Sequence, residues 1–185
     1  MALAVSITMS GCSTISDWFA DEEEIEIRRL KPIEAKFSPT LAWERDIGDG
    51  VDHYFSRLRP VYAYNKLYAA DRHGAVVAME PETGKVLWEK DFAQFRSESM
   101  MSAVTKLWRS GETARIGGIS VADRHVFIGT ENGYIAAMDA ETGELAWDAT
   151  VPGEILAAPA ADEGILVVNT GAGSLFGFNT RTGEE

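Results

Sequence analysis

The most regular feature of the chain is a series of short apolar runs separated by turns that contain glycine. Runs at residues 67–70, 126–129 and 166–169 are each followed by a glycine turn and then by a second apolar run. The turn residues recur too often for helices of ordinary length, and Asn-Gly, as at Asn132-Gly133, is a strong hairpin signal. The pattern therefore predicts short β-strands joined by tight turns.

These runs belong to one unit that the sequence repeats. Residues 67–88 (LYAADRHGAVVAMEPETGKVLW) align without a gap with residues 126–147 (VFIGTENGYIAAMDAETGELAW). A third copy, LVVNTGAGSLFGFNTRTGE, begins at Leu166, 40 residues after the start of the second. A period near 40 residues is typical of the blades of a β-propeller.

Glycine and tryptophan mark fixed positions in each copy. The second turn of each copy ends in Thr-Gly, where a glycine in the left-handed conformation is expected, and the last strand leads to a tryptophan. Asp139 and Asn179 precede these turns and can accept hydrogen bonds from turn amides, whereas Glu80 is less suited to that contact. The predicted structural positions of the repeat are Gly84, Trp88, Gly143, Trp147 and Gly183.

A further apolar segment precedes each copy, at residues 58–63, 116–121 and 155–160. This makes four short strands per unit, the content of one propeller blade. Trp43, in LAWERDIG, is expected to lie on the outer strand of another blade. The predicted fold of residues 37–185 is all-β, a partial β-propeller of four-stranded antiparallel blades: two complete blades, a third without its outer strand, and the Trp43 strand.

The N-terminal region has a different character. Residues 1–11 are apolar, end in small residues and are predicted to be the remnant of a signal peptide. Cys12 follows directly, as in the bacterial lipobox, which predicts lipid attachment at Cys12. Residues 12–36 carry the acidic run DEEEIEI and are predicted to be a solvated tether. Ser13 follows the cysteine, and the resemblance to lipoprotein signals implies sorting to the outer membrane.

Charge and composition exclude several functions. The formal net charge of −12 makes a nucleic-acid partner unfavourable, and no apolar run is long enough to span a bilayer as a helix. His53, His73 and His125 share no metal-ligand spacing, and the chain has no P-loop, G-x-S-x-G or H-E-x-x-H motif. We therefore expect no catalytic residue, no metal site and no cofactor.

The segments AMEPETGKVLW and AMDAETGELAW resemble the repeat of quinoprotein-type propellers, in which the tryptophan wedges between blades. Together with Cys12, the acidic tether and FSPTLAWERDIG, they resemble the BamB family of lipoproteins. The resemblance implies a non-enzymatic scaffold of the outer-membrane β-barrel assembly (BAM) complex, on the periplasmic face of the outer membrane. It also implies contact with a BamA-type subunit and other BAM subunits. The chain would be an N-terminal fragment of an eight-bladed ring, with the family's docking loop beyond Glu185.

Two alternatives and one unexplained segment remain. A quinone-dependent dehydrogenase uses the same repeat but needs calcium ligands and often adjacent cysteines, whereas Cys12 is the only cysteine and precedes the fold. Another envelope lipoprotein with this repeat is the second alternative. The extra segment 92–115 is rich in apolar residues and either packs on a blade or contacts a partner, for which the candidate residues are Phe95, Met101 and Trp108.

Overall fold

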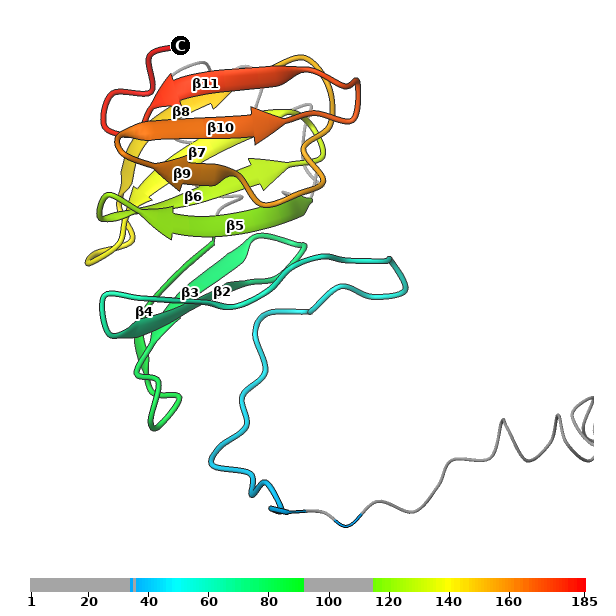
Figure 1. Ribbon diagram of the computed structural model, residues 1–185, viewed down its shortest axis with the longest axis vertical. Helices are drawn as coiled ribbons and strands as arrows, with labels where there is room; N and C mark the ends of the chain where they lie inside the picture. The colour runs from blue at the N-terminus through cyan, green and yellow to red at the C-terminus, as the bar shows by residue number, and fades with distance from the viewer. Residues whose placement is uncertain (1–33, 35, 92–114) are drawn as a thin grey trace, which may run out of the picture. The chain divides into compact units, whose positions relative to one another are not determined.

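The computed structural model describes residue 34 and residues 36–91 and 115–185 (Figure 1). Two compact units divide the chain, Met1–Thr40 and Leu41–Glu185, and every described strand belongs to the second. Cys12 and the candidate partner loop with Phe95, Met101 and Trp108 lie outside the described residues. In the described ranges there is no helix with the length and apolar character needed to cross a membrane.

The described residues form eleven strands in three antiparallel sheets, each with its strands in chain order (Figure 1). The first blade consists of β1 (Val61–Ala63), β2 (Lys66–Ala70), β3 (Ala75–Met79) and β4 (Val86–Asp91). The second blade consists of β5 (Ile116–Ala122), β6 (His125–Thr130), β7 (Tyr134–Asp139) and β8 (Leu145–Thr150). The third blade consists of β9 (Ala160–Asp162), β10 (Ile165–Asn169) and β11 (Leu175–Asn179). The prediction of two four-stranded blades and a three-stranded one is confirmed.

The strand predicted at 116–121 is confirmed by β5, but the strands predicted at 58–63 and 155–160 are too long. β1 contains only Val61–Ala63, after Pro60, and residues 155–159 are not a strand. Proline cannot donate to a ladder, which explains why the strands begin after Pro60 and Pro159. Ile155 instead donates its N–H to the carbonyl of Thr130 in the second blade at 3.0 Å. Residues 41–47, around Trp43, pair with no strand among the described residues, so the expected outer strand of another blade stays a prediction.

Alternating side chains build two apolar layers between the blades, because successive residues of a strand point to opposite faces. The first interface, between the first and second blades, buries Tyr68, Val76 and Ala78 against the face that carries Ile128 and Met138. The opposite face of the second blade packs against the third blade and forms the second interface. The apolar residues buried there are Phe127, Ile135, Ala137, Trp147, Leu166, Val168 and Phe178. The core therefore lies between the sheets, as in a propeller.

Candidate functional site

Each described repeat tryptophan packs on the glycine of the next copy. A Cβ added at Gly84 would lie 2.5 Å from the ring of Trp43, and one at Gly143 would lie 2.8 Å from the ring of Trp88. These glycines have φ values of +66° and +72°, in the left-handed region that other residues rarely adopt. Glycine is therefore required at these positions for two reasons: it has no side chain to clash with the tryptophan ring, and it adopts the left-handed backbone conformation.

The indole nitrogens repeat the same contact. Trp43 Nε1 donates to the carbonyl of Pro81 at 2.9 Å, and Trp88 Nε1 donates to that of Ala140 at 3.2 Å. Trp147 Nε1 donates to the carbonyl of Thr180 at 2.8 Å. Trp43 thus has the position of a blade tryptophan even though it lies in no strand, so it marks a preceding blade position as the sequence indicates.

Carboxylate and amide groups in the repeats hold the second turns. Asp139 Oδ1 accepts the backbone N–H groups of Glu141 and Thr142, both at 2.8 Å, and these hydrogen bonds hold the pKa of Asp139 below its usual value. Asn179 accepts the N–H groups of the corresponding turn in the third blade. The Glu80 carboxylate accepts the Thr83 hydroxyl at 2.9 Å and, among the described residues, no backbone N–H of the turn, which agrees with its expected poorer fit.

Between described residues, three ion pairs cross the first interface. Lys66 pairs with Glu141, and Lys90 pairs with Glu144 at 2.6 Å; in both pairs the carboxylate is largely exposed. The third pair, Arg72 with Glu131, is largely buried: one guanidinium nitrogen lies 2.7 and 2.8 Å from the two carboxylate oxygens. The guanidinium carbon of Arg72 also lies 4.0 Å from the ring centroid of Tyr54, a cation–π contact.

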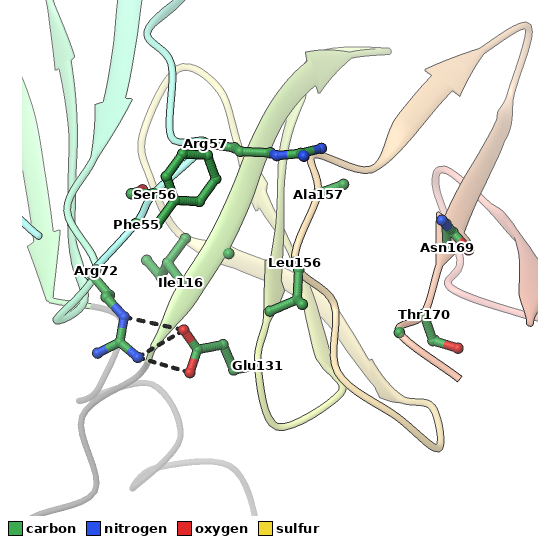
Figure 2. Close-up of a pocket in the computed structure, with 12 residues that line it drawn as sticks. Phe55, Ser56, Arg57, Arg72, Ile116, Glu131, Leu156, Ala157, Asn169 and Thr170 are labelled. Carbon is green, nitrogen blue, oxygen red and sulfur yellow. Dashed lines mark hydrogen bonds and ion pairs between the residues drawn. The ribbon is translucent and has the colours of Figure 1, made fainter. Parts of the chain in front are cut away.

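This buried pair forms one wall of a hollow of about 410 Å³ at one end of the blades (Figure 2). The hollow is built from the β2–β3, β6–β7 and β10–β11 turns and from the segments that lead into the three blades. A repeated hydrogen bond holds each turn to its segment: Arg72 N–H to Gly50 C=O at 3.0 Å, Glu131 N–H to Arg115 C=O at 3.0 Å, and Gly171 N–H to Glu154 C=O at 2.7 Å.

Two adjacent glycines of β5 let the segment before the third blade approach closely, and Gly117 also lines the hollow. A Cβ at Gly117 would lie 2.1 Å from the carbonyl oxygen of Ile155, and one at Gly118 would lie 2.3 Å from the amide nitrogen of Ala158. The pairing of β5 with β6 shifts register between Ile116 and Gly118, so Gly117 has no opposite residue in the ladder. The segment between the second and third blades therefore runs directly against β5 and places Leu156 in the lining of the hollow.

An aromatic ring and a cation form the rim. The side chain of Phe55 is 87% exposed, and the guanidinium carbon of Arg57 lies 5.9 Å from its ring centroid. Figure 2 shows Arg57 extended across the hollow toward Ala157, while Asn169 and Thr170 line the far side. The sequence does not reveal this site, because residues 51–60 precede the core of the first copy and their side chains differ from those before the other copies.

The histidines do not gather into a site. His73 Nε2 lies 2.8 Å from a carboxylate oxygen of Asp52, and His125 Nδ1 lies 2.8 Å from the carbonyl of Asp123. Among the described residues, no three His, Cys, Asp or Glu side chains are grouped closely enough to hold a metal ion. The side chain of His73 is half-buried in its turn.

Comparison with known proteins identifies the family. The family described as "Outer membrane protein assembly factor BamB" matches residues 35–104 and 102–185. The outer membrane protein assembly factor BamB of Alteromonas naphthalenivorans is 74% identical over 169 residues, which are 91% of this chain and 40% of that protein. The chain spans about two fifths of the length of the curated relatives it matches.

Solved structures agree on the fold. BamB from Moraxella catarrhalis is 22% identical with a TM-score of 0.53, over 68% of this chain and 32% of that one. A quinohemoprotein alcohol dehydrogenase from Pseudomonas putida is 21% identical with a TM-score of 0.54, over 78% of this chain and 21% of that one. Likeness at this identity shows the fold alone, a partial β-propeller. The family match covers most of the sequence, and on that basis the chain belongs to the BamB family of outer membrane protein assembly factors.

Proposed function

We propose that the protein is a non-enzymatic scaffold of the outer-membrane β-barrel assembly complex and assists the insertion of β-barrel proteins. The observation that carries this proposal is the 74% identity with an outer membrane protein assembly factor over 91% of the chain. The geometry supports it, because the polar groups of the repeat, such as Asp139 and Asn179, stabilise turns. The indole N–H groups hold one blade to the next.

The proposed partners are a BamA-type subunit and the other subunits of the complex. The test is affinity purification of the tagged full-length protein from membranes, followed by quantitative mass spectrometry. The BamA-type subunit is expected in near-equal amount to the tagged protein. Its absence, with the tagged protein folded and membrane-bound, would contradict the proposal.

The alternative, a quinone-dependent dehydrogenase, predicts a different result from the same preparation. A scaffold should carry no quinone after purification, and its spectrum should contain only protein absorbance. A stoichiometric quinone, or electron transfer from an alcohol to a dye after quinone and calcium are added, would favour the enzyme.

The proposed location is the periplasmic face of the outer membrane, through a lipid on Cys12. Labelled palmitate should be incorporated into the wild-type protein and not into Cys12→Ala, which should appear in the soluble periplasmic fraction. Ser13→Ala serves as the matched control and should be labelled like the wild type. Equal labelling of the Cys12 variant would exclude Cys12 as the attachment point.

The loop with Phe95, Met101 and Trp108 is proposed as a partner contact. Replacing all three residues by serine should reduce recovery of the BamA-type subunit and leave the melting temperature unchanged. If these side chains instead pack on a blade, the melting temperature should fall. The two measurements on one variant therefore separate the two interpretations of the segment.

A further inference from the structure

The hollow at the blade ends exposes apolar surface that the described chain leaves uncovered. Phe55 is 87% exposed and Leu156 is 48% exposed, while Ile116 closes the floor as a fully buried residue. The ring of Phe55 lies next to the Arg57 guanidinium. Exposed apolar groups collected around a hollow with a polar rim are typical of a binding surface, whereas single exposed residues are ordinary.

The charge at the hollow is opposite in sign to the net charge of the chain. The chain has a net charge of −12, yet the charged side chains that line the hollow are Arg57, Arg72 and Glu131. Arg72 and Glu131 neutralise each other in the bidentate pair. Arg57 has no carboxylate within ion-pair distance among the described residues, so the hollow carries one positive charge that is available to a ligand.

The polar groups of the lining suit a peptide. Asn169 presents an exposed side-chain amide, which can both donate to and accept from a peptide group, and it comes from a different blade than Arg57. A ligand that contacts both must extend across the second blade, along β5 and the segment with Leu156 (Figure 2). Along this path lie the Arg57 cation, the apolar depression and the Asn169 amide. They match an extended peptide segment that has an apolar side chain beside a carboxylate.

We propose that the hollow is a docking site for a polypeptide segment of a partner protein, one that places an aromatic or aliphatic side chain against Phe55 and Leu156 and an adjacent carboxylate on Arg57. The proposal needs neither the lipid anchor nor the barrel-assembly complex, so it stands or fails separately from the proposed function.

The test uses a dye-labelled, capped hexapeptide, Gly-Ser-Phe-Asp-Ser-Gly, whose fluorescence anisotropy is measured as purified full-length protein is added. Saturable binding is expected, weakened roughly three- to tenfold by Asp-to-Asn or Phe-to-Ala replacement in the peptide. Arg57→Gln should weaken binding of the Asp peptide by a similar factor and should bind the Asp and Asn peptides equally. Lys85→Gln is the matched control, since Lys85 is an exposed lysine that does not line the hollow, and should bind like the wild type.

Three outcomes would overturn the proposal. These are no saturable binding of the peptide at millimolar protein, equal affinity of the wild type for the Asp and Asn peptides, and unchanged affinity of Arg57→Gln. A second experiment addresses a membrane ligand, with vesicles of phosphatidylglycerol in place of the peptide. Arg57-dependent binding to vesicles without binding to the peptide would assign the hollow to a lipid surface instead. Both Arg57 and Lys85 are exposed, so circular dichroism should show both variants folded.

Discussion

The two blade interfaces use the same tryptophan contact but surround it differently. At the first interface, Trp88 is half-buried beside Tyr68, and the hydroxyl of Tyr68 and the indole N–H of Trp88 both donate to the carbonyl of Ala140. At the second, Trp147 is 8% exposed and has two aromatic neighbours, Phe127 and Phe178, with ring centroids at 6.0 and 6.3 Å.

The polar contacts differ as well. Three ion pairs cross the first interface, and between described residues none crosses the second, where Thr180 donates its hydroxyl to Asp123 at 2.7 Å. The comparison shows that the repeat fixes the tryptophan, the glycine and the acceptor carbonyl, while the surrounding contacts vary from one interface to the next. The first interface should therefore respond to charge and pH, and the second mainly to the loss of apolar volume.

The largest expected effect is at Trp147. Replacing this buried ring by alanine removes its packing with Phe127 and Phe178, and the free energy of unfolding should fall by about 3–5 kcal/mol. Trp88→Ala should cost less, because Trp88 is only half-buried. Urea unfolding of the full-length protein measures both. Equal losses would mean that burial does not distinguish the interfaces.

Replacing Gly143 tests how much the contact between this glycine and the Trp88 ring contributes to stability. Gly143→Ala adds a Cβ that would lie 2.8 Å from the Trp88 ring and also forces alanine to φ +72°. The loss should be about 2–4 kcal/mol, of which roughly 1–2 kcal/mol is backbone strain. Gly173→Ala is the matched control, since Gly173 has φ +84° but no atom within 4 Å of an added Cβ. If the two variants lose the same stability, the ring contact contributes nothing.

The Arg72–Glu131 pair is expected to rank third. Arg72→Met leaves the largely buried Glu131 carboxylate without its partner and should cost about 1.5–3 kcal/mol. Lys90→Met removes an exposed pair and should cost less than about 1 kcal/mol, an effect that salt reduces. Melting temperatures at low and at 1 M salt separate the two. Equal salt sensitivity of both variants would show that the Arg72 pair is as solvated as the Lys90 pair.

Among the fully buried side chains, Tyr68 should give the smallest effect at neutral pH, when it is replaced by phenylalanine. Ala140 keeps the Trp88 N–H as a donor, so the loss at pH 7 should be about 1 kcal/mol. Burial, together with Glu141, raises the pKa of Tyr68 to about 12 from 10.0. The neutral phenol therefore stabilises the fold below pH 10, and that contribution is lost as the pH rises from 10 to 12. The wild type should lose more stability than Tyr68→Phe over this range in denaturant titrations; parallel losses would contradict the assignment.

Much of the fold follows from local pattern. The Asn-Gly and Thr-Gly turns and the alternation of residues such as Val126 and Ile128 contain enough information to predict the hairpins. The entering segments were predicted less well, because the apolar run at 155–160 is also what a segment packed against another blade requires. A single sequence cannot distinguish burial by pairing from burial by packing against Gly117 and Gly118.

The hollow could not be predicted from the sequence. Its residues come from three blades. Arg57 and Leu156 occupy equivalent positions, three residues before Pro60 and Pro159, but their side chains differ in chemistry, so no shared pattern marks them. The pairing of each tryptophan with the glycine of the next copy was equally hidden, although one signal exists. Each tryptophan at the end of a copy is followed by a copy that contains Thr-Gly. This regular pairing of the two residues indicates that they are in contact.

The direction of the tryptophan contact has a consequence for the order of folding. Trp43 precedes Gly84, Trp88 precedes Gly143, and Trp147 precedes Gly183, so every contact joins a ring to a turn that is made 36 to 55 residues later. In a chain that emerges N-terminus first, each new turn meets a ring that is already present, and no blade has to wait for a distant segment. Such short-range closure favours stepwise growth from the N-terminus, in the order of synthesis and export.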